Sequence, residues 1–145
     1  MKIRIKSIND KYETSDGVRV LVNDWLPAGL DEYKVHADMW LKDLEPAARL
    51  REYLDEDFGN WREYEDLCIR EMSREKDLPL AMIIESAMYG TVTLLYSRGD
   101  EQHNNAIIVR DCILASRDEF VPVWVERQEA MAKEAAWHGT FRKAA

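Results

Sequence analysis

The sequence contains few of the features that mark several classes of protein. Only two of its 145 residues are cysteines, Cys68 and Cys112, and neither belongs to a CxxC pair or to a zinc-like cluster with histidine. We therefore expect two small buried hydrophobic residues, in preference to a thiol nucleophile, a redox pair or a disulfide. Apolar runs of about 18 residues, which a membrane-spanning helix needs, are missing. Segment 1–6 also lacks the apolar stretch of a signal peptide, so the sequence predicts a cytoplasmic protein without membrane contact.

Positive charge is scarce as well. The chain has 20 Lys and Arg residues against 28 Asp and Glu residues, a formal net charge of −8. Nucleic acids and anionic membranes are bound through clustered positive charge, so we expect neither as a partner. The sequence has no glycine-rich phosphate loop and no G-x-S-x-G elbow, and we expect no cofactor and no metal site. The acidic run 55–57 could bind a hard cation or a basic partner, but it lacks calcium-loop spacing and we expect a solvated surface.

What is present is the pattern of an α/β domain. The length and the apolar content of 46% suit one folded core. Residues 2–8 alternate between apolar and polar, which predicts an edge strand. Segment 18–22 is β-branched and nearly continuous, and segment 91–96 is the clearest central strand, so both are expected to be interior strands. Segment 38–44 fits either a helix or a strand. Helices are expected at 31–36, 48–54, 61–72, 79–89, 105–115 and 124–141.

Two helix ends carry specific signals. Asn60 is a suitable N-cap for the helix at 61–72, with Glu63 completing a capping box, and Gly90 is a natural C′ residue. Helical crossovers between strands return the chain in a parallel direction. The sequence therefore predicts an α/β fold, with a small, predominantly parallel sheet flanked by helices. Residues 1–116 would form this domain, and 117–145 would form a C-terminal helical extension of it.

The candidate ligand site is a pair of polar loops that follow the interior strands, at 23–29 and 97–105. Ligands of open α/β sheets bind beyond the carboxyl ends of the strands, where helix N-termini also present free amides. The alternative is a solvated loop in which Asn104 or Asn105 merely caps the next helix. The ligand-binding candidates are Asn23, Asp24, Arg98, Asp100, His103 and Asn104.

His103 is the best acid–base candidate, because imidazole titrates near neutral pH, and Asp100 is the nearest carboxylate in the sequence. Both are weak catalytic candidates, because a spacing of three residues in a loop does not establish their geometry. His36 and His138 are expected on the surfaces of helices.

Four blocks of the sequence together resemble the domain of unknown function 488 family, in its YeaO-like form. They span about residues 2–115, and their order and spacing are more specific than any block alone. The resemblance implies a small α/β fold whose biochemical role is largely unassigned. The blocks are 17–22 with Pro27 and Gly29, 40–46 with Leu50 and Arg51, the helix with Trp61, Tyr64 and Glu65, and 92–96 with Asp100, His103 and Asn104.

The sequence departs from the family pattern in the first loop. That loop usually reads Asp-Arg-Leu-Trp-Pro-Arg-Gly, whereas residues 23–29 have Asp24 and Ala28 where the resemblance places arginines. If those arginines hold an anionic substrate in the family, this chain has lost them. A degenerate, non-catalytic member is therefore the leading hypothesis.

We accordingly predict a non-catalytic protein that binds a small polar ligand or regulates, with its pocket between loops 23–29 and 97–105. The alternative is a small enzyme that uses Arg98 and His103 on a polar or nucleotide-like substrate. Whether the chain is an enzyme is left open by the sequence. The helix at 124–141 carries Trp124 and Trp137, which would either pack back on the domain or form a homodimer contact.

Overall fold

The computed structural model describes residues 1–115, so the predicted helix at 124–141, with His138 and the homodimer contact, lies outside the described residues. Four strands form one parallel sheet: β1 (Ile3–Ser7), β2 (Val18–Leu21), β3 (Met39–Trp40) and β4 (Val92–Tyr96). Their order across the sheet is β1-β4-β2-β3, with Ile3 opposite Val92, Val18 opposite Val92, and Val20 opposite Met39. The predicted α/β class with a parallel sheet is confirmed.

The position of each strand follows its hydrophobicity. Every residue of β4 is buried, and this strand lies between β1 and β2. β1 is only half-buried along its length and forms an edge, as its alternating sequence predicts. Side chains alternate across the sheet, so Val20 and Leu94 face one core cluster while Leu21 and Leu95 face another.

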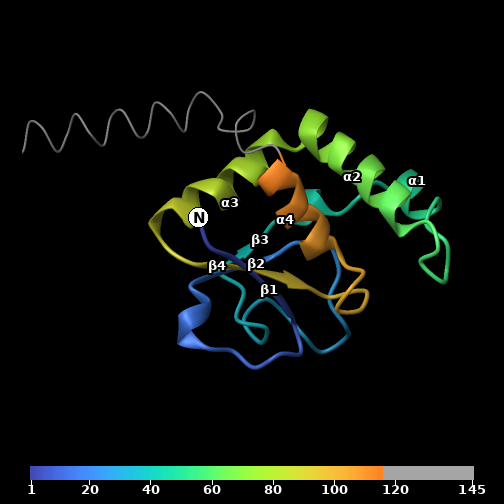
Figure 1. Cartoon of the computed structure of the whole chain (residues 1–145). Helices are drawn as coiled ribbons and strands as arrows, with labels where there is room; N and C mark the ends of the chain where they lie inside the picture. Colours follow the sequence, from blue (N-terminus) through green and yellow to red (C-terminus); the bar gives the residue numbers. More distant parts are fainter. Residues whose placement is uncertain (116–145) are drawn as a thin grey trace, which may run out of the picture.

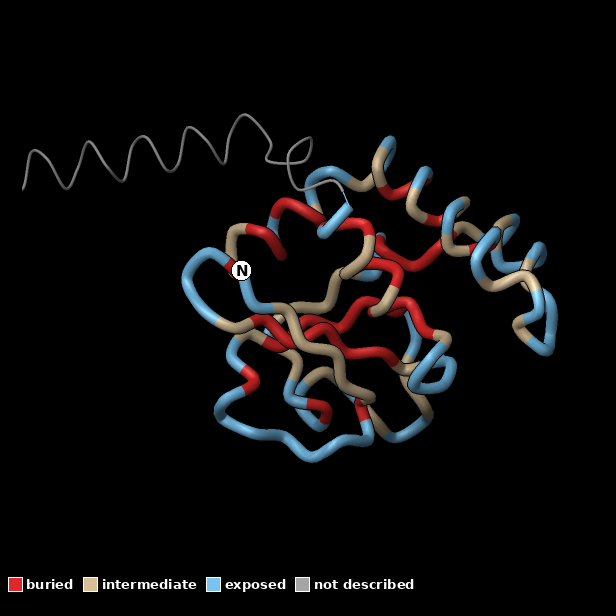
Figure 2. The backbone as a smooth tube through the Cα atoms, viewed as in Figure 1, coloured by how far each residue is buried: buried red, intermediate tan, exposed pale blue. Residues whose placement is uncertain are grey.

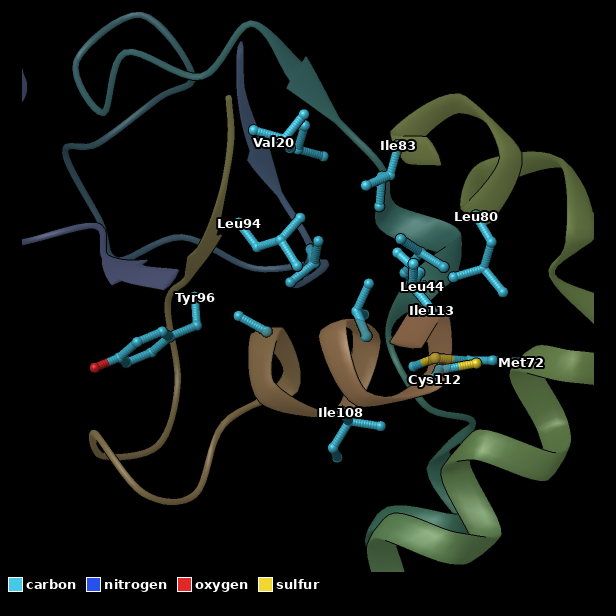
Figure 3. Packing of buried hydrophobic residues seen from close by; sticks show 14 of the residues in the cluster. Val20, Leu44, Met72, Leu80, Ile83, Leu94, Tyr96, Ile108, Cys112 and Ile113 are labelled. Atoms are coloured by element: carbon cyan, nitrogen blue, oxygen red, sulfur yellow. The ribbon is translucent and has the colours of Figure 1, made fainter. Parts of the chain in front are cut away.

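The helices cover one face of the sheet (Figure 1). They are α1 (Ala48–Arg51), α2 (Trp61–Glu75), α3 (Asp77–Tyr89) and α4 (Asn105–Ala115), with short 3-10 turns at Thr14–Asp16 and Lys42–Leu44. Figure 3 shows Ile108, Cys112 and Ile113 of α4 inside the larger core cluster, on the same side of the sheet as Leu94. The opposite face is covered by the loop between β2 and β3, with Val35 buried against Leu95.

Both cysteines are buried and neither forms a disulfide. Burial raises the pKa of the Cys68 thiol to about 12, so a thiolate nucleophile is disfavoured there. The Cys112 sulfur lies 3.9 Å from the Ser73 hydroxyl. Within residues 1–115, none of the helices has both the length and the hydropathy needed to cross a membrane.

Two local predictions are wrong or only partly right, and the open choice for segment 38–44 is resolved. Residues 31–36 form a single turn instead of a longer helix. The Asp31 side chain caps that turn through the Lys34 amide, and His36, with a positive φ of 54°, ends it as the Ala37 amide bonds back to the Glu32 carbonyl. His36 is exposed, but on a turn. Segment 38–44 contains both a strand, β3, and a 3-10 turn. The helix expected at 48–54 is only the four-residue α1.

The predicted capping signals are also used differently. Asn60 precedes α2, but its amide bridges the Asp55 amide N–H at 2.8 Å and the Tyr53 carbonyl at 2.7 Å, so it does not cap the helix. Glu63 accepts a hydrogen bond from the Tyr53 hydroxyl and completes no capping box. Gly90 does follow α3, but its φ of 172° is extended and not the left-handed conformation of a C′ glycine.

A buried ion pair supports the sheet on the side away from the helices. Asp16 and Arg19 are 0% and 1% exposed, and the Arg19 guanidinium donates to Asp16 and, at 3.0 Å, to the carbonyl of Val35. Lys6 also reaches the Asp16 carboxylate at 2.8 Å. The Asp16 carboxylate thus joins β1, β2 and the 3-10 turn of 14–16.

Burial across the whole domain follows the strands. Figure 2 shows that β2 and β4 are buried and that the turns of the chain are exposed.

Candidate functional site

The two predicted loops do meet at the carboxyl ends of β2 and β4. Asn23 is 3% exposed, and its Oδ1 accepts a hydrogen bond of 2.9 Å from the Ser97 amide. The Arg98 guanidinium lies 5.0 Å from the centre of the Trp25 ring, a cation–π contact between the loops. Because β2 and β4 are neighbours in the sheet, residues that follow them are brought together despite lying 74 positions apart.

A pocket of about 210 Å³ lies at this edge of the domain. Its lining differs from the prediction, because one wall comes from segment 45–64 and only Asn23 comes from the first loop. Asp24 is exposed and does not line it, although its carboxylate lies 3.9 Å from Arg98. The lining residues are Asn23, Glu45, Pro46, Arg51, Leu54, Phe58, Trp61, Tyr64, Arg98, Gly99, His103, Asn104, Asn105 and Ile108.

Glu45 is the buried charge of this pocket. Its side chain is only 6% exposed, and its Oε1 lies 3.2 Å from Arg98 and 3.8 Å from Arg51. Its Oε2 accepts a 2.9 Å hydrogen bond from Asn23 Nδ2. Burial raises the pKa of the Glu45 carboxyl, and the nearby negative charge of Asp24 adds to that, while Asn23 and Arg98 act in the opposite direction.

His103 is held from two sides at the pocket wall. Its Nδ1 lies 3.0 Å from Asp100 Oδ1, and its ring stacks on Phe58 with centroids 4.3 Å apart and planes 5° apart. The edge of Trp61 completes the aromatic contact at 5.2 Å. The hydrogen bond from His103 lowers the pKa of the Asp100 carboxyl, so Asp100 is a carboxylate that orients the imidazole.

The loop that carries this pair needs glycine at 99. Gly99 has a φ of +96°, and a Cβ there would lie 1.9 Å from the His103 carbonyl oxygen. That carbonyl accepts a 3.0 Å hydrogen bond from the Asp100 amide, which closes the turn. Glycine therefore allows the backbone approach that places Asp100 beside His103.

The N-terminus of α4 contributes two asparagines. Asn104 Oδ1 accepts a 3.0 Å hydrogen bond from the Ile107 amide, so Asn104 is the helix cap. Asn105 donates from Nδ2 to the carbonyls of Val22 and Leu44 at 2.6 and 3.0 Å. Its Oδ1 is buried and has no hydrogen-bond partner in the described part of the chain. Asn105 thus ties α4 to β2 and leaves one buried acceptor beside the pocket.

The pocket therefore includes residues that the sequence did not single out as a site. Glu45, Arg51 and Asn105 supply polar groups, and Phe58 and Tyr64 supply apolar surface. The contacts that bring them together span up to 83 positions, as between Asn105 and Val22, and a single sequence carries no direct signal for contacts at such separations. The acidic run 55–57 is exposed, and residues 1–115 contain no group of three or more His, Cys, Asp or Glu side chains that could hold a metal ion.

Comparison with known proteins gives a family. The model of the inactive DUF488-N3 subclade matches residues 2–130, which extends past the last described residue. The chain is also similar to the uncharacterized protein YeaO of Escherichia coli (strain K12), with 26% identity over 111 residues that cover 77% of this chain and 96% of that protein. No solved structure matches the chain significantly. The chain therefore belongs to the DUF488 family, within its inactive DUF488-N3 subclade.

Proposed function

We propose that this protein is a non-catalytic module that binds a small ligand in the pocket between α4, loop 97–105 and segment 45–64. The observation that carries the proposal is the buried carboxylate of Glu45, which lines an open pocket and is matched there by Arg98 and Asn23. Charged side chains whose pKa is shifted by burial gather at functional sites, and Glu45 is such a group inside a pocket.

The size and the walls of the pocket limit the ligand. A volume of about 210 Å³ is smaller than the roughly 300–1,000 Å³ of drug-sized sites. Trp61, Tyr64 and Ile108 give it apolar walls, and the polar groups converge at one side. This arrangement suits a molecule with one ring and one polar head group.

Two facts support a module without catalysis. The subclade to which the chain belongs is described as inactive. The first loop also has Asp24 and Ala28 where the resemblance places arginines, so the chain lacks two cationic groups that could hold an anionic substrate. Binding without turnover accounts for both facts while retaining a role for the pocket.

The proposal can be tested with single-ring probes and a matched pair of variants. Benzamide, benzamidine and benzoate would be titrated into the full chain by ligand-observed NMR, with dissociation constants of about 1 mM expected for fragments of this size. Leu54 lines the pocket, whereas Leu78 is an exposed residue of α3 outside it. Leu54→Trp should abolish binding by filling the pocket, and Leu78→Trp should leave it intact. No binding by any probe, or equal binding by both variants, would contradict the proposal.

A second candidate is the small enzyme that uses Arg98 and His103. The contact between His103 Nδ1 and Asp100 at the pocket wall favours it, because a carboxylate that orients an imidazole is the arrangement of a general base. Turnover of a bound ligand that disappears in His103→Ala would establish this alternative and would refute the non-catalytic proposal.

We also propose that the C-terminal segment mediates a homodimer in the cytoplasm. The support is its sequence, in which Trp124, Trp137 and Phe141 are many large apolar residues for one helix. Light scattering of the full chain and of a chain truncated after Ser116 tests this proposal. If truncation leaves the number of subunits per particle unchanged, the segment makes no dimer contact.

A further inference from the structure

We propose that Glu45 serves as a built-in anion, which closes the pocket to anionic ligands and selects a neutral planar ring with an amide-type head. This inference rests on the proposed binding function of the pocket and names the class of ligand that it would take.

Arg98 and Arg51 line the pocket, and in the absence of Glu45 they would attract a carboxylate or a phosphate to the carboxyl ends of the strands. The Glu45 carboxylate lies 3.2 Å from Arg98 and 3.8 Å from Arg51, and Asp24 lies 3.9 Å from Arg98 on the outer side. Two carboxylates thus match two guanidinium groups, and the protein itself fills the anion position.

A ligand in the pocket would meet both hydrogen-bond acceptors and donors. A bound head group would find an acceptor for an N–H in the Glu45 carboxylate, which lines the pocket and accepts from Asn23 through Oε2. It would also find the remaining N–H donors of Arg98, because a guanidinium has five and the contacts with carboxylates use only some of them. A carboxamide carries both N–H donors and a carbonyl acceptor, so it can satisfy the two kinds of group together.

Ligands with a charged head group are disfavoured in this pocket. A carboxylate ligand would lie close to Glu45 and would be repelled at low dielectric. A cationic head would be attracted by Glu45, but the two arginines lie within 4 Å of the same carboxylate and would oppose it. A neutral head avoids both conflicts, and the Trp61 and Tyr64 walls favour a flat ring next to it.

The experiment compares three probes that share one ring and differ in the head group: benzamide, benzamidine and benzoate. Ligand-observed NMR titrations would measure the affinity of each for the full-length wild type, for Glu45→Gln and for Glu52→Gln. Glu52 is exposed and does not line the pocket, so its variant controls for the general loss of one negative charge. In the wild type, benzamide should bind at least about tenfold more tightly than benzoate. Benzamide can donate an N–H to the Glu45 carboxylate, whereas the carboxylate of benzoate would be repelled by it.

Glu45→Gln should reverse this order by raising the affinity for benzoate at least about tenfold, since Arg98 and Arg51 would then be free to pair with it. Adding Arg98→Gln to that variant should remove the gain, and Glu52→Gln should behave as the wild type. Circular dichroism would confirm that the variants are folded, and if Glu45→Gln did not fold, the wild-type preference would still decide. Benzoate binding to the wild type as tightly as benzamide, or an unchanged order in folded Glu45→Gln, would overturn the inference. Absence of binding by all three probes to every variant would instead refute the binding function itself.

Discussion

The buried carboxylate of Asp16 gives the sharpest prediction about the stability of this fold. Asp16 is 0% exposed, and it is the partner of the equally buried Arg19 and of Lys6. We predict that Asp16→Asn, which keeps the shape of the side chain and removes its charge, destabilises the protein strongly at pH 7. The reason is that Arg19 would remain in the interior with its positive charge unmatched.

The size of the effect follows from what remains after the substitution. Breaking a buried ion pair costs about 3–5 kcal/mol when one charge is left without its partner. Arg19 keeps hydrogen bonds to the carbonyls of Val35 and His36, both at 3.0 Å, and the Lys6 side chain is 16% exposed and can turn to water. These compensations place the expected loss at the lower end, about 3 kcal/mol.

The pH dependence gives the prediction a second, independent part. Although burial by itself raises the pKa of Asp16, the hydrogen bonds from Lys6, the Glu13 amide and Arg19 outweigh it and hold the pKa below the usual 3.8. A carboxyl whose pKa is depressed in the folded state stabilises the protein above its unfolded pKa, and that stabilisation is lost as the pH falls through the folded value. The difference between wild type and Asp16→Asn should therefore be full at pH 7 and should shrink below about pH 4.

Urea unfolding at pH 7 and at a series of acidic values measures both parts. The control is Asp10→Asn, because the exposed Asp10 carboxylate accepts a single amide hydrogen bond, from Ser7, and its loss should cost about 1 kcal/mol or less. A loss of less than about 1 kcal/mol for Asp16→Asn at pH 7, or a difference from wild type that persists unchanged to pH 3, would refute the reasoning.

Four further predictions use thermal or urea unfolding, and three of them have a matched control residue. Glu45→Gln should change stability at pH 7 by less than about 1 kcal/mol, and a large loss would contradict this. Relative to wild type it should gain stability as the pH rises above the ordinary glutamate pKa of 4.5, because a carboxyl whose pKa is raised by burial makes the wild type less stable over that range. Leu94→Ala should cost about 2–5 kcal/mol, because Leu94 is 0% exposed in the central strand, whereas the half-exposed Leu114→Ala should change stability by about 0.5 kcal/mol or less. Gly17→Ala should cost more than Gly29→Ala, since both glycines have positive φ but only at Gly17 would a Cβ meet backbone, 2.0 Å from the Thr91 oxygen; equal losses would show that the close contact is irrelevant. Asn104→Ala should cost about 1 kcal/mol through the loss of the α4 cap, and the exposed Asn9→Ala should cost nothing measurable.

The parts of the fold that could be predicted from the sequence are those set by local hydrophobic pattern. Residues 91–96 are rich in β-branched and apolar side chains, and Val92–Tyr96 form the central strand because only a strand covered on both faces buries every side chain. Segment 2–8 alternates between apolar and polar residues, and it forms an edge strand because only part of its surface is covered. Segment 31–36 starts as the sequence predicts, with Asp31 as the cap, but it stops after one turn because His36 takes a left-handed conformation, and residue propensity does not reveal such a stop at a histidine.

The site could be predicted only as far as topology determines it. The carboxyl ends of neighbouring parallel strands must coincide, and this geometric necessity brought Asn23 to Ser97 and Arg98. It could not place Glu45, which follows a 3-10 turn and reaches the pocket through the path of the chain after β3. The aromatic wall has the same origin, since Phe58 stacks on His103 across 45 positions.

The two buried carboxylates, Asp16 and Glu45, differ in what their charge does for the folded protein. Asp16 lies among donors that hold its pKa below the ordinary value, so its charge is favoured in the folded state and stabilises the sheet. Glu45 lies where burial outweighs its donors and raises its pKa, so its charge works against the folded state at neutral pH. A protein tolerates such a cost where the residue has a use other than stability. Because Glu45 is also the carboxylate that matches two arginines inside the pocket, the same residue that weakens the fold would decide which head group the pocket accepts.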